Sequence, residues 1–156
     1  MEDFLAKYFS PIGWITLSGN DEGLISLKFE DTMPDDKPLL TPMADECIRQ
    51  LDEYFKGKRK SFDFRYQLQG TGFQKKVWDE ILKISYGHTS SYLAIAKAVG
   101  DKMSVRAVGN ANAKNPLALV VPCHRIIGNH GDLVGYGGGI WRKRWLLDFE
   151  SNQLHF

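Results

Sequence analysis

Residues 117–125 read LALVVPCHR, five apolar residues followed at once by Pro122, Cys123, His124 and Arg125. The apolar run has the length and composition of a short buried strand, and a proline ends such a strand in a turn. This predicts that Cys123 lies at the end of a buried strand, beside an imidazole and a guanidinium. Because cations and hydrogen-bond partners stabilise a thiolate, a cysteine placed there can become a nucleophile.

Cys123 could instead be a small core residue, which is the commonest fate of a free cysteine. Three neighbours favour a chemical role: Pro122 fixes the backbone, His124 is a natural base at neutral pH, and Arg125 adds a positive charge. A histidine that acts on a thiol needs a third group to hold its tautomer. The best candidate is Glu150 on an expected helix, and two other carboxylates stay open as alternatives, Asp132 and Asp148.

Length and composition indicate an ordinary globular protein. The chain has 156 residues, of which 43% are hydrophobic, enough for one domain or two small ones. It shows no secretory h-region and no apolar run near the ~20 residues that cross a bilayer. Its two cysteines, Cys47 and Cys123, form neither a disulfide framework nor a zinc-ligand cluster. We therefore expect a reducing, cytoplasmic setting, no metal and no membrane association.

The net charge of +1 conceals an asymmetry between the two halves of the chain. Residues 1–69 carry 9 Lys and Arg against 13 Asp and Glu, whereas residues 70–156 carry 11 against 6. The candidate nucleophile lies in the basic half. This distribution suggests a polyanionic partner such as nucleic acid.

The first half has the pattern of a small α/β unit. Alternating apolar residues and a Gly-rich turn at 19–23 predict a hairpin, and a second alternation begins at Phe62. Thr41 and Pro42 form a helix start, with Gly57 as its stop. The predicted elements are strands over 8–18, 24–30 and 62–68 and a helix from Pro42 to the residue before Gly57.

The second half begins at Gly70 and is predicted to be mainly helical. Thr71 and Gln74 form a capping box for a helix with Phe73, Val77, Trp78 and Ile81 in the core. Ser91 and Ser104 are predicted to cap two short helices over 92–99 and 105–113, whose connection at 100–103 has helix-turn-helix proportions. The second of these helices is slim, because four of its residues are alanine or glycine: Ala107, Gly109, Ala111 and Ala113.

A glycine-dense loop over 128–139 with Tyr136 inside it follows the cysteine. Such a loop lets a planar ligand approach the backbone closely. A final helix carrying Trp141, Trp145, Leu146 and Phe149 is expected to be amphipathic and to pack those residues on the core.

Several ordered motifs over residues 70–150 resemble the O6-alkylguanine-DNA alkyltransferases, also called methylated-DNA–protein-cysteine methyltransferases. Residues 1–69 resemble that family in general layout. The motifs are Ser91-Tyr92, RAVG at 106–109, Asn115-Pro116, VPCHRIIG at 121–128, GYGGG at 135–139 and WLLDFE at 145–150.

This resemblance implies an α+β protein of two domains. Residues 1–69 would form a small α/β domain, a three-stranded antiparallel sheet with a helix, like ribonuclease H. Residues 70–156 would form a mainly helical domain with a winged-helix-like helix-turn-helix. The implied partner is double-stranded DNA that contains alkylated guanine, with no cofactor, no obligate protein partner and a monomeric state.

The resemblance also implies the chemistry. The protein would bind the minor groove, rotate O6-alkylguanine (with O4-alkylthymine as a second candidate) out of the duplex, and transfer the alkyl group irreversibly to Cys123. His124 would deprotonate Cys123 through a water, and Glu150 would orient His124. Asn115 would bridge the helix-turn-helix to the cysteine turn, and Tyr92 would assist flipping and give a proton to the leaving base.

The resemblance implies that Arg106 would fill the gap left by the flipped base. It also implies which residues form the base pocket and which form the DNA-binding surface. The pocket would contain Tyr92, Tyr136, Gly137 and the backbones of Cys123 and Ile126. The DNA surface would contain Ser91, Tyr92, Arg106, Ala107, Gly109, Asn110, Ala113 and Arg125.

Three alternatives are less consistent with the sequence. A lesion sensor without chemistry would carry Trp in place of Cys123. A cysteine hydrolase built on Cys123, His124 and Glu150 would have an awkward geometry, because cysteine and histidine are adjacent on one turn. A helix-turn-helix regulator needs several long polar residues that read bases, and the slim helix carries mainly small ones.

Overall fold

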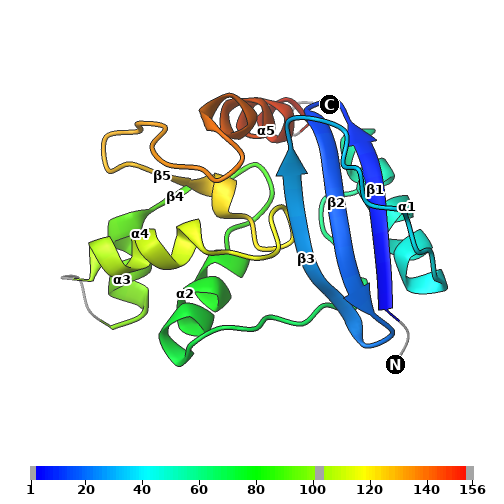
Figure 1. The fold of residues 1–156 in the computed structure, drawn as a ribbon. Helices are drawn as coiled ribbons and strands as arrows, with labels where there is room; N and C mark the ends of the chain where they lie inside the picture. Colours follow the sequence, from blue (N-terminus) through cyan, green and yellow to red (C-terminus); the bar gives the residue numbers. More distant parts are fainter. Residues whose placement is uncertain (1–2, 101–103, 154–156) are drawn as a thin grey trace. The chain divides into compact units, whose positions relative to one another are not determined.

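The computed structural model describes residues 3–100 and 104–153. The chain divides into two compact units (Figure 1). The described residues up to Gln69, together with Pro116–Ala118, form the N-terminal unit. The described residues of Gly70–Asn115 and those from Leu119 onward form the C-terminal unit.

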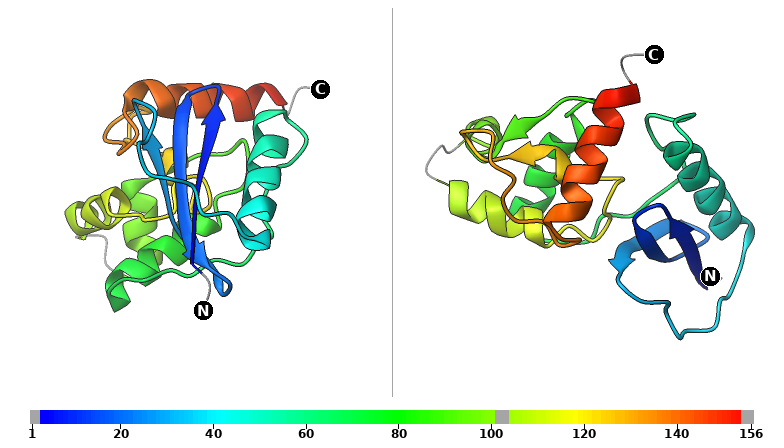
Figure 2. Two further views of the ribbon diagram at one scale, coloured as in Figure 1. Left: turned by 45° about the vertical axis from the view of Figure 1, so that its right-hand side comes forward. Right: turned by 90° about the horizontal axis from the view of Figure 1, so that it is seen from above.

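The N-terminal unit is a three-stranded antiparallel sheet with one helix against it (Figures 1 and 2). Its strands are β1 (Asp3–Ser10), β2 (Gly13–Asn20) and β3 (Gly23–Glu30), in that spatial order. Helix α1 (Pro42–Phe55) starts where the sequence predicted, with the Thr41 side chain accepting from the Ala44 amide. On β1, Tyr8 stacks on Phe55 of α1 at a ring distance of 6.1 Å.

The expected sheet is confirmed, but two of its predicted strands are wrong. The segment 8–18 is interrupted by a turn at Pro11 and Ile12, which Gly13 permits with a φ of +104°. The segment 62–68 is not a strand: it makes one parallel bridge, between Leu24 and Tyr66. Phe62 packs on α1 instead, with its ring centre 5.5 Å from that of Tyr54, and Phe64 packs on Phe62 with ring centres 5.4 Å apart.

The C-terminal unit is mainly helical. Its elements are α2 (Gly72–Leu82), β4 (Ser90–Ser91), α3 (Tyr92–Ala98), α4 (Val105–Ala113), the 3-10 turn η1 (Cys123–Arg125), β5 (Ile126–Ile127) and α5 (Ile140–Gln153). The capping box of α2 is present, and Trp78 is buried where its indole donates to the Ala111 carbonyl at 2.9 Å. Phe73, predicted to be core, is 38% exposed because it lies in the first turn of α2, one turn before the buried Val77.

Helices α3 and α4 have the predicted bounds to within one residue. Ser91 caps α3 as expected, whereas the Ser104 side chain makes no capping hydrogen bond to α4. The predicted connection at 100–103 lies, from Asp101 to Met103, outside the described residues. Helix α4 buries Val108, Ala111 and Asn112 and leaves its small residues Ala107 and Ala113 exposed.

The strand predicted at 117–121 is wrong, although most of its residues are buried. Leu117 makes a single parallel bridge to Leu27 of β3 within the N-terminal unit. The chain then turns, with Leu119 at a φ of +71°, and reaches Cys123 through Pro122. Hydrophobicity therefore predicted the burial of these residues correctly, but it did not predict their backbone conformation.

Helix α5 only partly buries the apolar face that the sequence predicted: Leu146 is buried, whereas Trp145 and Phe149 are half-buried. Trp141 is 54% exposed, and the buried residues of the helix are Arg142, Lys143, Leu146 and Glu150. The three charged side chains are tolerated because each makes hydrogen bonds, as buried charges must. No described helix is long and apolar enough to cross a membrane.

Candidate active site

Cys123 opens the turn η1 and is 6% exposed. Asn115, just after α4, donates from Nδ2 to the Val121 carbonyl at 2.8 Å and lies 3.2 Å from the Cys123 sulfur. One amide therefore contacts both the thiol and the backbone that leads to it. This is the connecting position that the resemblance assigned to Asn115.

Glu150 of α5 is the carboxylate beside His124. Its Oε2 lies 2.9 Å from His124 Nε2, and both side chains are completely buried. The two alternative carboxylates, Asp132 and Asp148, are exposed. A buried carboxylate at this distance holds an imidazole in one tautomer and one orientation, so the geometry selects Glu150 for that position.

Arg125 lies inside the protein and not on a DNA-facing surface, which corrects the sequence prediction for this residue. It is 7% exposed. Its guanidinium donates to both oxygens of Glu150, at 2.8 and 2.9 Å, and to the Ile84 carbonyl at 2.8 Å. A guanidinium used in this bidentate way is not available to a phosphate group.

In the resting site, the thiol of Cys123 and the imidazole of His124 are both uncharged. Burial raises the pKa of the Cys123 thiol, and this outweighs the opposing hydrogen bond from Asn115 and the positive charge of Lys143. The sequence expectation that nearby cations would lower this pKa is therefore wrong in net effect. Burial also lowers the pKa of His124 and outweighs its hydrogen bond to Glu150, so that the imidazole is neutral at pH 7.

The second ring nitrogen of His124 is positioned to take part in proton transfer. Nδ1 is buried and makes no hydrogen bond with the described residues, while Nε2 is occupied by Glu150. Burial alone would raise the pKa of Glu150, but its contacts with His124 and Arg125 hold that pKa well below its usual range. The carboxylate is therefore ionised, and a neutral imidazole beside it can accept a proton.

A cavity of about 280 Å³ lies in the same unit. It is lined by Tyr92, Gly109, Asn112, Ala113, Gly135, Tyr136 and Gly137. Helices α3 and α4 and the glycine loop thus form its walls, and a Cβ on Gly109 would come within 3.9 Å of the Tyr92 ring. Tyr136 lines this cavity, and burial, followed by the neighbouring Cys123, raises the pKa of its hydroxyl well above the usual value.

Cys123 and Ile126 do not line this cavity directly. Both are buried, Cys123 in η1 and Ile126 at the start of β5, which pairs in parallel with β4. The predicted DNA residues Arg106, Ala107 and Asn110 are exposed on α4. Arg142 and Lys143 were not predicted from the sequence, in which they appear as part of a basic triplet within the aromatic pattern of the last helix.

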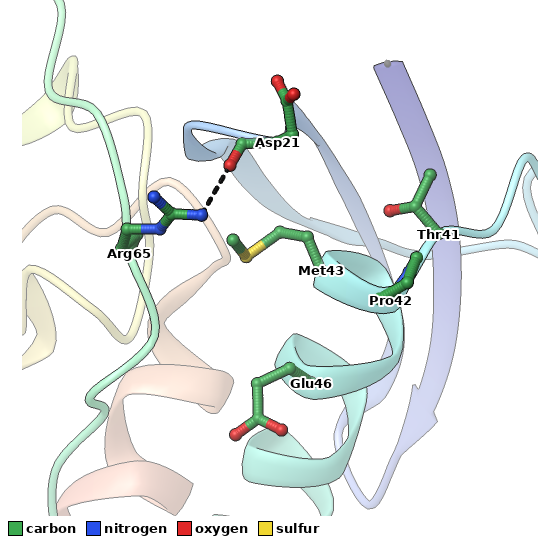
Figure 3. Close-up of a pocket in the computed structure, with 6 residues that line it drawn as sticks. All are labelled: Asp21, Thr41, Pro42, Met43, Glu46 and Arg65. Atoms are coloured by element: carbon green, nitrogen blue, oxygen red, sulfur yellow. Dashed lines mark hydrogen bonds between the residues drawn. The ribbon is translucent and has the colours of Figure 1, made fainter. Parts of the chain in front are cut away.

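A second cavity, of about 400 Å³, lies within the N-terminal unit (Figure 3). Its lining is Asp21, Thr41, Pro42, Met43, Glu46 and Arg65, with Arg65 donating to the Asp21 carbonyl at 2.8 Å. Its lining contains no cysteine or histidine. Among the described residues, no group of three or more His, Cys, Asp or Glu side chains is arranged to hold a metal ion.

Two family models match the chain, one for each unit. The model described as "6-O-methylguanine DNA methyltransferase, DNA binding domain" matches residues 72–152. The model described as "6-O-methylguanine DNA methyltransferase, ribonuclease-like domain" matches residues 4–68.

Individual relatives agree with these matches. The methylated-DNA–protein-cysteine methyltransferase of Methanosarcina barkeri is 44% identical over 150 residues, covering 93% of this chain and 95% of the relative. The protein of the same name from Mycobacterium tuberculosis is 45% identical over 148 residues, covering 92% and 90%. The crystal structure of Mycobacterium tuberculosis OGT in complex with DNA superimposes with a TM-score of 0.86 at 43% identity, covering 94% and 92%. The chain therefore belongs to the methylated-DNA–protein-cysteine methyltransferase family.

Proposed function

We propose that this alkyl-repair enzyme rotates O6-alkylguanine out of double-stranded DNA and transfers the alkyl group irreversibly to the sulfur of Cys123, once per molecule. The observation that carries the proposal is the buried Cys123, contacted by Asn115 and followed by the His124–Glu150 pair, in the unit that also contains the cavity. A nucleophile next to an oriented base is the arrangement that covalent catalysis needs.

The transfer is a displacement at the alkyl carbon. A bond forms between the Cys123 sulfur and that carbon while the bond from carbon to guanine O6 breaks. The thiol proton passes through a water to Nδ1 of His124, and Glu150 stabilises the resulting imidazolium. Tyr92 gives a proton to the guanine as it leaves. The product is a thioether, which has no acyl carbon for water to attack, so the protein is consumed.

The exposed face of α4 is the proposed DNA surface. Its small residues, among them Ala107, Gly109 and Ala113, let the helix approach the minor groove closely, and Asn110 and Ser91 lie beside the duplex. Arg106 enters the base stack where the flipped nucleotide was. Extrusion costs a few kcal/mol and is easiest for a poorly paired base, which favours an alkylated guanine.

We infer that the carbonyls of Cys123 and Ile126, which lie outside the cavity lining, accept from the exocyclic amine of the base. Tyr136 and the Gly137 amide would form the opposite wall. O4-alkylthymine is the second candidate lesion. The protein would act as a monomer, without a cofactor or an obligate protein partner, inside the cell where its DNA is.

The first test is intact-protein mass spectrometry after mixing with a duplex that contains one O6-methylguanine. We expect a gain of about 14 Da, the mass difference between S–H and S–CH₃, on Cys123 and at most once per chain. Cys123→Ala should lose the gain and keep DNA binding, while the matched control Cys47→Ala should keep both. Tight lesion binding by the wild-type protein without a mass gain would instead identify a non-catalytic sensor.

A second test addresses base flipping. Arg106→Ala should slow transfer from the duplex far more than transfer from a free O6-alkylguanine base, because only the duplex requires extrusion. Lys114→Ala, which removes an exposed positive charge beside the same helix, controls for charge alone. Equal losses on the duplex and on the free base would refute the flipping role of Arg106.

A further inference from the structure

Two side chains from different helices share one main-chain oxygen above the cavity. The Tyr92 hydroxyl of α3 donates to the Val134 carbonyl at 3.2 Å, and Nζ of Lys143 on α5 donates to the same oxygen at 2.9 Å. Lys143 also lies 3.5 Å from the Gly135 carbonyl. Val134 comes directly before the residues of the glycine loop that line the cavity, so this oxygen is where the loop is attached to both helices.

Burial of the Lys143 ammonium costs free energy at this position. The side chain is 0% exposed, and its ammonium donates to two main-chain carbonyls, those of Val134 and Gly135. Burying an ammonium costs free energy that two neutral acceptors offset only in part. Burial accordingly lowers the pKa of Lys143 to about 8. A neutral apolar residue would fill the same space at lower cost, which suggests that the ammonium serves the site.

The loop that Lys143 holds is also attached to α5 at a second point. Gly135 has a φ of +50°, a conformation that favours glycine, and as a glycine it has no side chain to pack against the protein. The Gly139 amide donates to the Tyr136 carbonyl at 2.9 Å, a contact within the loop itself. Arg142 donates to the Gly138 carbonyl at 2.8 Å and so anchors the other end. The wall formed by Gly135–Gly137 thus lies between two cations of α5.

We propose that Lys143 is a positioning residue for alkyl transfer, which holds the Val134 carbonyl and the adjoining pocket wall in place when Tyr92 leaves that carbonyl to contact the flipped base. The inference rests on the proposed function, because it requires a base in the cavity. Tyr92 cannot donate to Val134 and to a base at once with its single hydroxyl proton. Lys143 keeps the shared oxygen satisfied during that exchange.

The same ammonium acts on the nucleophile. Its positive charge favours the thiolate of Cys123 and opposes the effect of burial. During the displacement negative charge develops on the sulfur, and a fixed cation nearby stabilises it. Lys143 therefore contributes to the maximal rate of transfer and not to the affinity for DNA.

The test is single-turnover kinetics of Lys143→Met with protein in excess over methylated duplex. A misplacement of about 1 Å costs about 100-fold in rate, so the maximal rate constant should fall about 10- to 100-fold. The fall should be similar on duplex and on free O6-methylguanine, with little change in the half-saturating protein concentration. The final stoichiometry should stay at one methyl group per chain. Lys143→Arg, which keeps charge and donors, should recover part of the rate.

The matched control is Arg144→Met, which removes an exposed positive charge from the adjacent position of α5 and should react at the wild-type rate. A wild-type maximal rate in Lys143→Met would overturn the proposal. A change in the half-saturating protein concentration alone, with the maximal rate unchanged, would overturn it as well. A stoichiometry below one per chain with an unchanged rate would show a purely structural role. If Lys143→Met does not fold, Lys143→Gln gives the same comparison. A wild-type protein that transfers no methyl group would instead refute the proposed function itself.

Discussion

Replacing Arg125 by Met tests whether this residue is structural, as its burial indicates, or binds DNA, as its sequence context suggested. The substitution removes two hydrogen bonds to Glu150 and one to the Ile84 carbonyl, and leaves a fully buried carboxylate without the guanidinium that pairs with it. Removing one member of a buried ion pair costs about 3–5 kcal/mol. At about 2–4 °C per kcal/mol for a chain of this size, the melting temperature should fall by about 6–20 °C.

The assay is thermal unfolding followed by circular dichroism, together with fluorescence anisotropy of an undamaged duplex at a temperature where every variant is folded. Arg125→Met should melt early and bind DNA as the wild type does. Lys83→Met, which breaks an exposed ion pair with Glu80 in the same unit, should change neither quantity. An unchanged melting temperature combined with weaker DNA binding would show that the guanidinium reaches the DNA, and would refute this reasoning.

Three further outcomes are expected. Gly70→Ala places a Cβ 2.6 Å from the ring of Trp78, which its bond to Ala111 holds in place, so thermal unfolding should show a loss of about 1–3 kcal/mol; Gly72→Ala, with open space around it, should be neutral. Burial lowers the pKa of His124, so the base form persists below pH 6.5, and the rate of methyl transfer should fall only on further acidification; a rate already falling between pH 8 and about 6.5 would contradict this. Duplex affinity should decrease steeply with salt, and a salt-independent affinity would refute binding through the basic half of the chain.

Local capping motifs in the sequence were sufficient to predict where α1, α2 and α3 begin. Thr41 with Pro42, and Thr71 with Gln74, satisfy the amide groups that every helix start exposes, and such motifs act within four residues of one another. Ser91 does the same for α3. The bounds of these helices were therefore predictable without knowledge of the tertiary structure.

The errors occurred where distant residues decide the backbone. Residues 117–121 are apolar enough for a strand, yet only Leu117 finds a partner strand, at Leu27, and the chain then turns at Leu119. Residues 62–68 likewise meet β3 at a single bridge. A strand needs a neighbour along its length, and hydrophobicity specifies burial without specifying that neighbour.

The buried face of α5 could not be predicted for a related reason. Charged residues are normally placed on the outer face of a helix, and that rule did not predict the burial of Arg142 and Lys143. The rule fails because the partners of Lys143 and Glu150 lie outside the helix, at Val134 and at His124 and Arg125. A prediction that selects the buried face of a helix from hydrophobicity alone will miss a helix that buries charged side chains with hydrogen-bond partners elsewhere in the protein.

The network around Glu150 explains how a thiol and an imidazole can both stay neutral until substrate is present. If Glu150 had His124 as its sole partner, its charge would favour a permanent imidazolium. Arg125 neutralises the carboxylate through two hydrogen bonds, so that the effect of burial on His124 prevails. Burial likewise keeps the proton on Cys123. If each chain reacts once, as we propose, it benefits from this, because a resting thiolate would be exposed to any electrophile, whereas a neutral thiol becomes reactive when an alkyl group is held against it and its proton has a base to go to.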